Sequence, residues 1–87
     1  MEDEKMVDVN TSLQNLFEIA VTTLEDVEAG EIFIVKELFR GFEWNRIAKG
    51  NRTKLGSMMY AYALGEGAEA LEPLDKTPQN QQRYRKL

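Results

Sequence analysis

The side chains best suited to chemistry in this sequence gather between residues 49 and 60, and the chemistry they suit is anion binding. Lys49, Arg52 and Lys54 place positive charge around the expected start of a helix, where the helix dipole is already positive. Each such placement costs on the order of 0.3–1 kcal/mol unless an anion lies nearby, whereas open backbone N–H groups at a helix start bind phosphate well. The pattern therefore predicts a phosphate contact. The alternative is that Glu43 or another acid pairs with these charges inside the fold.

The helix that would carry these charges is expected to run from Asn51, a good N-cap residue, to about residue 64. The residues expected to form its buried stripe are Leu55, Met58, Met59 and Tyr62. At about 100° per residue, the opposite face carries Thr53, Ser57 and Tyr60. If this helix enters a DNA groove, these three side chains would meet base edges or sugar, and the flanking charges would contact phosphate.

Catalytic chemistry has little support in this sequence. There is no His and no Cys, so the usual nucleophile–base pairs cannot be assembled. Carboxylate pairs such as Glu25/Asp26 and Glu66/Glu69 are scattered over positions expected to be exposed, and no spacing matches an EF-hand or another metal site. We therefore expect no enzyme activity, no catalytic residues, no metal ligands and no cofactor.

The net charge of −4 hides a segregation of charge along the chain. Residues 1–30 hold eight acids and one Lys, a net charge of −7, whereas residues 31–87 hold ten bases and seven acids, a net charge of +3. Because binding depends on the local field, an acidic back and a basic front are compatible with nucleic-acid binding. The alternative is that both charge sets are merely solvated faces.

Length and composition indicate one domain with an ordinary apolar core. The chain has 87 residues, of which 43% are hydrophobic and 9% aromatic. Residues 1–9 are expected to form a flexible acidic tail, and residues 10–87 a single domain. The N-terminus lacks the apolar segment of a signal peptide, and no apolar run is long enough to span a membrane. With the absence of cysteine, these features predict a cytoplasmic protein.

Three elements are expected before the basic cluster. An amphipathic helix is expected to begin near Thr11, its N-cap, and to end at Gly30. A short strand is then expected over residues 31–35, where the run Ile-Phe-Ile-Val favours extended chain. A short helix over residues 36–40 follows, and Gly41 is expected to end it.

The C-terminal segment is expected to form a β-hairpin wing. Residues 68–74 indicate a strand that Pro73 confines to the edge of a sheet. The polar and basic residues expected along the wing are Lys76, Thr77, Gln79, Asn80, Gln81, Arg83 and Arg85. The alternative is a helix that starts at Thr77 and Pro78, which form a suitable cap and first helical residue.

The order helix, strand, helix, helix and hairpin is typical of a winged helix-turn-helix, an α+β fold with three helices and a small antiparallel sheet. In this fold the strand near Ile32 pairs with the C-terminal segment, and the helix over about residues 51–64 is the recognition helix. The residues expected to share one core are Phe17, Leu24, Phe33, Leu38, Trp44, Leu55 and Tyr62. The residues expected to contact DNA are Lys49, Asn51, Arg52, Thr53, Lys54, Ser57, Tyr60, Lys76, Gln79, Arg83 and Arg85.

The aromatic spacing in the second part of the chain also carries a resemblance to a known family. The residues that carry it are Phe33 to Phe39, Gly41 and Phe42, Trp44 to Ile47, Arg52, Leu55 and Gly56, and the ending Asn80 to Lys86. Over residues 30–87 the chain resembles a family of short uncharacterised proteins of Gram-positive bacteria, their phages and plasmids. The resemblance implies a compact domain and a mobile-element setting, and no mechanism.

The leading interpretation is a small winged-helix protein that binds double-stranded DNA as a regulator or accessory factor of phage or plasmid type. The second interpretation is a protein-binding module that occupies a host protein, such as a nuclease or a replication component. The acidic residues that would then mimic phosphate are Glu18, Glu25, Asp26 and Glu28. A third interpretation is a structural homodimer. Binding to duplex DNA at low and moderate salt separates the first interpretation from the second.

Overall fold

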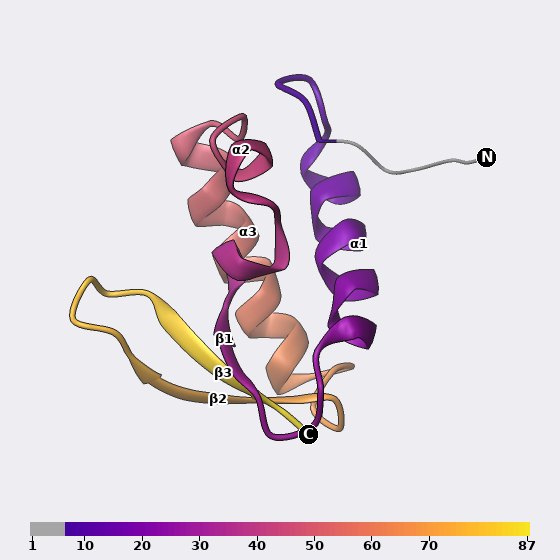
Figure 1. The fold of residues 1–87 in the computed structure, drawn as a ribbon, viewed down its shortest axis with the longest axis vertical. Coiled ribbons are helices and arrows are strands. Elements are labelled where there is room, and N and C mark those ends of the chain that lie inside the picture. Colours follow the sequence, from indigo (N-terminus) through magenta and orange to yellow (C-terminus); the bar gives the residue numbers. More distant parts are fainter. Residues whose placement is uncertain (1–6) are drawn as a thin grey trace.

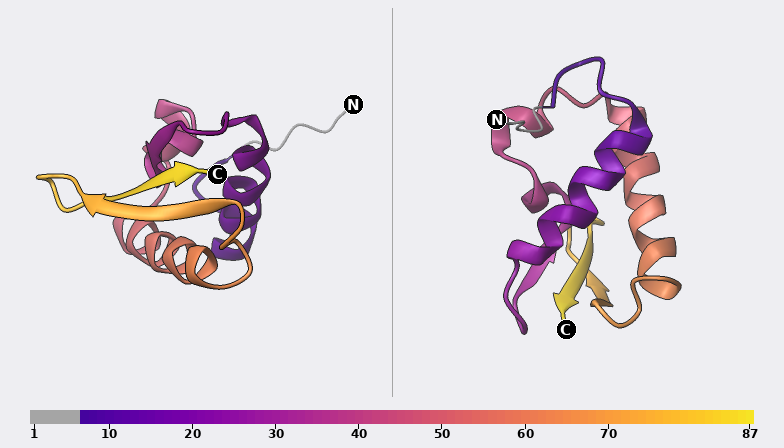
Figure 2. Two further views of the ribbon diagram at one scale, coloured as in Figure 1. Left: turned by 90° about the horizontal axis from the view of Figure 1, so that it is seen from below. Right: turned by 90° about the vertical axis from the view of Figure 1, so that its right-hand side faces the viewer.

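Three α-helices and a three-stranded antiparallel sheet make up the computed structural model, which describes residues 7–87 (Figure 1). In chain order the elements are α1 (Leu13–Thr23), η1 (Leu24–Asp26), β1 (Ile32–Ile34), η2 (Val35–Leu38), α2 (Gly41–Trp44), α3 (Lys49–Leu64), β2 (Leu71–Lys76) and β3 (Gln82–Lys86), where η marks a 3₁₀ turn. Helices α1 and α3 lie side by side, and the β2–β3 hairpin reaches beyond the helices on the side away from α1 (Figures 1 and 2). This winged-helix-like α+β arrangement confirms the expected fold class.

The sheet is built around β3, the last strand of the chain. Its order is β1-β3-β2, and both neighbours run antiparallel to β3. Tyr84 in β3 lies opposite Phe33 of β1 and Pro73 of β2. Pro73 lies on an edge strand, as expected, because it has no N–H to donate to a second neighbour. The C-terminal segment is therefore a hairpin and not the alternative helix, and the expected pairing with the Ile32 region is confirmed.

A tight polar turn joins β2 to β3 and forms the tip of the wing. The Asn80 N–H donates to the Thr77 carbonyl at 2.8 Å, and the Thr77 N–H donates to the Gln81 carbonyl at 2.8 Å. Asn80 has a φ of 68°, a left-handed conformation that Asn tolerates better than most residues. The wing tip is thus fixed by local hydrogen bonds.

The first helix is shorter than expected and uses a different cap. Ser12, not Thr11, is the N-cap, since its hydroxyl accepts a backbone N–H of the first turn at 3.1 Å. Helix α1 ends at Thr23 instead of Gly30, because Leu24–Asp26 tightens into a 3₁₀ turn that ends in extended chain. Gly30 still adopts a left-handed conformation, with a φ of 94°, in the turn that leads to β1.

The segment after β1 also differs from the prediction. Val35–Leu38 forms a 3₁₀ turn, at whose start the Glu37 carboxylate accepts the Ile34 N–H at 3.0 Å. Gly41 begins the short helix α2 instead of ending a helix, because Arg40 is extended and serves as the N-cap. The expected helix over residues 36–40 was therefore wrong in type and in position.

Helix α3 begins earlier than the expected N-cap. Ala48 has the extended N-cap conformation, and its carbonyl accepts from the Arg52 N–H at 3.0 Å, so Asn51 lies in the first turn and does not cap the helix. The side-chain preference for Asn at a cap misplaced the start, since the backbone turns at Ala48 with no side-chain cap. After α3, turns occupy residues 65–70, and β2 begins at Leu71, later than the expected strand.

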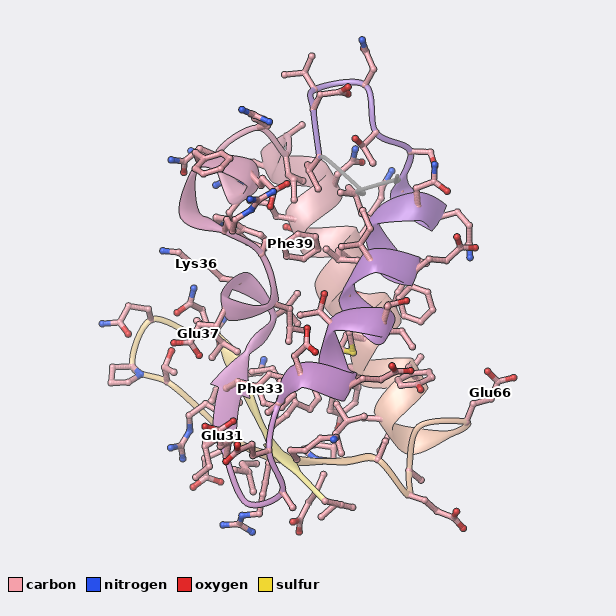
Figure 3. The ribbon with its side chains drawn as sticks, turned by 45° about the vertical axis from the view of Figure 1, so that its right-hand side comes forward. Glu31, Phe33, Lys36, Glu37, Phe39 and Glu66 are labelled. Atoms are coloured by element: carbon pink, nitrogen blue, oxygen red, sulfur yellow. The ribbon has the colours of Figure 1, made fainter. Side chains whose placement is uncertain are left out.

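One apolar core joins the helices to the sheet. Of the seven residues expected in it, four are buried, namely Leu24, Phe33, Leu38 and Leu55. The other three are partly buried and pack against the core, namely Phe17, Trp44 and Tyr62. Figure 3 shows Phe33 and Phe39 pointing inward. Tyr84 was not expected in the core, yet it is 0% exposed. No helix in residues 7–87 is long and apolar enough to cross a membrane.

A buried carboxylate holds the N-terminal end of the described chain. Residues 1–6 of the expected tail lie outside the described residues, whereas Val7 is 1% exposed. Glu43 accepts the Val7 N–H at 3.1 Å and pairs with Arg40 at 3.0 Å. The side-chain hydrogen bond from Arg40 is the largest cause that holds the pKa of Glu43 below its usual value. Ionised Glu43 therefore ties α2 to Val7.

We expect Leu55→Ala to lower the free energy of unfolding by about 2–5 kcal/mol, because Leu55 is 0% exposed and its truncation leaves a cavity beside the sheet. Leu64→Ala on the same helix is the matched control, since Leu64 is 63% exposed and its truncation should cost less than about 0.5 kcal/mol. Urea denaturation followed by circular dichroism measures both. Equal losses for the two variants would contradict the core described above.

We expect the free energy of unfolding of Glu43→Gln to depend less on pH in the acidic range than that of wild type. Because the folded pKa of Glu43 lies below its unfolded value, its ionised form stabilises the fold above that unfolded value, and the stabilisation is lost as the pH falls through the folded pKa. The difference in free energy of unfolding between wild type and Glu43→Gln should therefore be largest near neutral pH and shrink on acidification. Parallel curves from neutral to acidic pH would exclude this role.

Candidate nucleic-acid interface

A groove of about 900 Å³ lies between α3 and the β2–β3 hairpin. We name it the α3–wing groove. Its residues from α3 are Lys49, Arg52, Thr53, Gly56, Ser57 and Tyr60. Its residues from the hairpin are Lys76, Asn80, Gln81, Gln82 and Tyr84, and those from earlier in the chain are Ile34, Val35, Lys36 and Trp44. The hairpin stands out from the helices in Figures 1 and 2, and it forms the wall of the groove that faces α3.

The α3–wing groove is positively charged and contains no acid. Four cations line it, Lys36, Lys49, Arg52 and Lys76, and none of its lining residues is Asp or Glu. Figure 3 shows Lys36 projecting outward on the side of the hairpin, whereas Glu66 lies on the opposite side of the molecule. Like charges that share a concave surface raise its potential and attract anions.

The start of α3 adds open backbone donors beside these cations. Ala48, the N-cap, makes no side-chain capping bond, and the first turn contains no acidic residue. Within the described residues, the N–H groups of Lys49, Gly50 and Asn51 have no acceptor. The positive end of the helix dipole and the neighbouring cations therefore reinforce one another, which favours an anion at this end of the groove.

Arg52 is part of the groove surface and also part of the fold. Its guanidinium lies over the Trp44 ring, 5.3 Å from the ring centroid, and its Nη2 donates to the Trp44 carbonyl at 3.2 Å. The side chain is half-buried, and its Nε is buried without a hydrogen-bond partner among the described residues. Arg52 is therefore held against Trp44, whereas Lys54 is exposed.

Tyr84 of the central strand β3 also lines the groove. Its ring stacks on Phe33 with centroids 5.8 Å apart, and its hydroxyl is buried with no partner among the described residues. Burial, the larger cause, and the neighbouring Tyr60 raise the pKa of Tyr84 to about 12. The hydroxyl is therefore protonated at neutral pH and can donate a hydrogen bond.

The structure brings together six of the eleven residues predicted to contact DNA. Those that line the α3–wing groove are Lys49, Arg52, Thr53, Ser57, Tyr60 and Lys76. Asn51, Lys54 and Gln79 lie outside its lining, and the latter two are exposed. Arg83 and Arg85 lie in a second, shallower hollow.

Both wing arginines in this second hollow already have partners. The Arg83 Nε donates to the Asp75 carbonyl at 3.0 Å. The Arg85 guanidinium pairs with the Glu72 carboxylate at 3.2 Å across neighbouring strands. Both side chains are therefore held within the hairpin, and Glu72 offsets the charge of Arg85, whereas Arg83 keeps its charge because its partner is a neutral carbonyl.

Lys36, Trp44 and Tyr84 line the groove but were not among the predicted DNA contacts. Lys36 was expected in a helix, and it lies in the 3₁₀ turn η2 that follows β1. Trp44 was taken only as a core anchor, yet it lines the groove and supports Arg52. Tyr84 lies between Arg83 and Arg85, which were expected along the wing, and strand alternation places it on the face opposite to theirs.

The fold and the basic groove define a winged-helix-like protein in which α3 and the β2–β3 hairpin line a common concave surface. Residues 18–86 match the family model described as a domain of unknown function (DUF1413), and the chain belongs to that family. The match begins inside α1, earlier than the resemblance found from the aromatic spacing. No curated protein matches the chain, and no solved structure matches it either.

We expect Arg52→Gln to perturb Trp44, the single tryptophan of the chain. Loss of the guanidinium over the indole and of the bond to the Trp44 carbonyl should cost about 1–3 kcal/mol of stability. It should also move tryptophan emission to longer wavelength, because the ring becomes more exposed. Lys54→Gln, two residues away and exposed, is the control and should leave both readouts unchanged. An unchanged emission spectrum for Arg52→Gln would refute the stacking.

Proposed function

We propose that this protein binds double-stranded DNA, with α3 and the β2–β3 hairpin in contact with the duplex, as a small regulator or accessory factor. The observation that carries the proposal is the α3–wing groove, which four cations line and no carboxylate enters. A surface of this kind supplies the sequence-independent phosphate attraction on which DNA affinity largely depends.

The distribution of charge supports one docking face. Among the described residues, 7–30 hold five acids and no base, and three of these acids belong to α1 and η1. Figure 1 places α1 on the side of α3 away from the hairpin tip. DNA is therefore repelled from the α1 side and attracted to the groove side, and the net charge of −4 does not argue against binding.

The setting proposed for this activity is a mobile genetic element. The spacing of aromatic residues resembles proteins of Gram-positive bacteria, their phages and plasmids. The family to which the chain belongs has no assigned function. Small DNA-binding regulators suit such elements, and the winged-helix-like arrangement supports this class over an enzyme, for which the sequence offers no His or Cys.

One observation favours a second candidate, binding to a basic host protein. The acids Glu18, Glu25, Asp26 and Glu28 are exposed, and none of them forms an ion pair within the described residues. Carboxylates arranged on one side of a small protein can mimic phosphate against a basic partner. In this case the α3–wing groove would be only a solvated surface.

The test is fluorescence anisotropy of a labelled duplex at about 50 and 200 mM salt. Wild type should bind more tightly at the lower salt. Lys49→Gln and Lys76→Gln should weaken binding to every duplex sequence, and each should reduce the slope of log affinity against log salt by about 0.9 if one phosphate contact is lost. Both residues are exposed, so their replacement should leave the fold intact.

Arg85→Gln is the matched control for the same charge change. It removes a cation from the wing outside the groove, where Arg85 already pairs with Glu72, and it should change affinity less than Lys76→Gln does. Equal losses for Arg85→Gln and Lys76→Gln would mean that the attraction is not localised in the groove. No binding by wild type at the lower salt would refute the proposed function and favour the second candidate.

A further inference from the structure

Two buried side-chain polar atoms in the described chain lack a hydrogen-bond partner, and both belong to residues of the α3–wing groove. They are the Nε of Arg52 and the hydroxyl of Tyr84. They come from different elements, α3 and the central strand β3. Because proteins rarely leave such atoms unpaired, two of them on one groove point to an acceptor that the chain itself does not supply.

Of the two unpaired atoms, the Tyr84 hydroxyl is the stronger evidence for a ligand in the groove. Tyr84 is 0% exposed and stacks on Phe33, and a Phe at this position would make the same stack without an unpaired polar atom. Burial of the unpaired hydroxyl lowers stability, so packing alone gives no reason for it. A reason exists if the hydroxyl donates to a ligand that enters the groove.

We propose that the floor of the α3–wing groove seats the sugar–phosphate backbone of one DNA strand, with the Tyr84 hydroxyl and the Arg52 guanidinium each donating to a phosphate oxygen. This inference rests on the proposed function. The acceptor is anionic because the groove carries four cations and no carboxylate, and because the start of α3 presents open N–H groups there. A protonated phenol donates to such an oxygen, as it does to other anionic acceptors.

Tyr60 lies near Tyr84 in the groove. It lies close enough to Tyr84 to raise the pKa of that residue, it lines the groove, and it is 43% exposed. Rotation of the exposed Tyr60 side chain would open the floor to a phosphate. The strand would then lie along α3 between Lys49 and Tyr60, beside Lys36 and Lys76.

A DNA backbone bound in the groove would change the roles expected for the residues on α3. Thr53 and Ser57 lie inside the groove, and they would contact phosphate or sugar and not base edges. Sequence would then be read by side chains outside the groove, of which Lys54 and Gln79 are exposed. The groove would therefore set affinity, and its variants would weaken binding to all duplexes by the same factor.

The decisive variant is Tyr84→Phe, which removes only the hydroxyl. We expect its thermal unfolding midpoint to equal or exceed that of wild type, because an unpaired buried hydroxyl is lost. We expect its affinity for a short labelled duplex to be about tenfold weaker, with the same factor for duplexes of different sequence. Tyr62→Phe is the control, since Tyr62 packs edge-on against Phe17 of α1 and lies outside the groove. Its affinity should equal that of wild type.

A second arm separates the DNA backbone from free phosphate as the source of the anion. Emission of Trp44, which lines the groove, is followed during titration with the duplex and with inorganic phosphate. The proposal predicts a change with the duplex at far lower concentration than with inorganic phosphate. Equal or tighter binding of inorganic phosphate would overturn it in favour of a site for a free anion.

The remaining outcomes distinguish this inference from the proposed function. If wild type binds the duplex and Tyr84→Phe binds it equally well, the phosphate seat is wrong and the DNA-binding function stands. The same holds if the loss in Tyr84→Phe accompanies a lower unfolding midpoint, since the hydroxyl would then be structural. If wild type does not bind the duplex, both proposals fail.

Discussion

The position of β3 at the centre of the sheet is the constraint on which the rest of this structure depends. The last strand of the chain pairs with β1 on one side and β2 on the other. Tyr84 thereby lies between Phe33 and Pro73 at the base of the core. This pairing closes the chain over α3, and it places the hairpin beside that helix. Without it there is an amphipathic helix pair but no groove, because one wall of the groove is the hairpin itself.

The start of α3 shows a conflict between folding and charge. Its N-terminal turn has neither a side-chain cap nor an acid, and Lys49 and Arg52 surround it. Each of these features is locally unfavourable to the helix. The fold compensates for Arg52 by stacking it on Trp44 and bonding it to the Trp44 carbonyl, whereas Lys49 has no such partner among the described residues. Local rules broken without a structural gain are expected at functional sites.

The order of elements and the wing were predictable from the sequence because apolar periodicity and Pro73 act locally. Boundaries were less predictable: Asn51 is a better cap by preference, yet α3 starts from Ala48, because the backbone conformation of that residue decides the start. The basic residues of the site were predicted from the sequence, but the side chains and carbonyls that surround each of them were not. Arg52 and Arg85 are both basic residues that were predicted to contact DNA. Only the tertiary fold shows that Arg52 lies over the Trp44 ring and that Arg85 pairs with Glu72.

The two faces of the hairpin explain why total charge is a poor guide to this protein. On one face, Arg85 pairs with the Glu72 carboxylate, and Arg83 donates to the main-chain carbonyl of Asp75, so only the charge of Arg85 is offset within the wing. The other face contributes Lys76 and Tyr84 to the groove, and no acid accompanies them. A phosphate at the groove would therefore meet Lys76 and a neutral phenol without a competing carboxylate, whereas at Arg85 it would compete with Glu72. Whether a basic side chain is already paired with a carboxylate therefore matters more for anion binding than the number of bases.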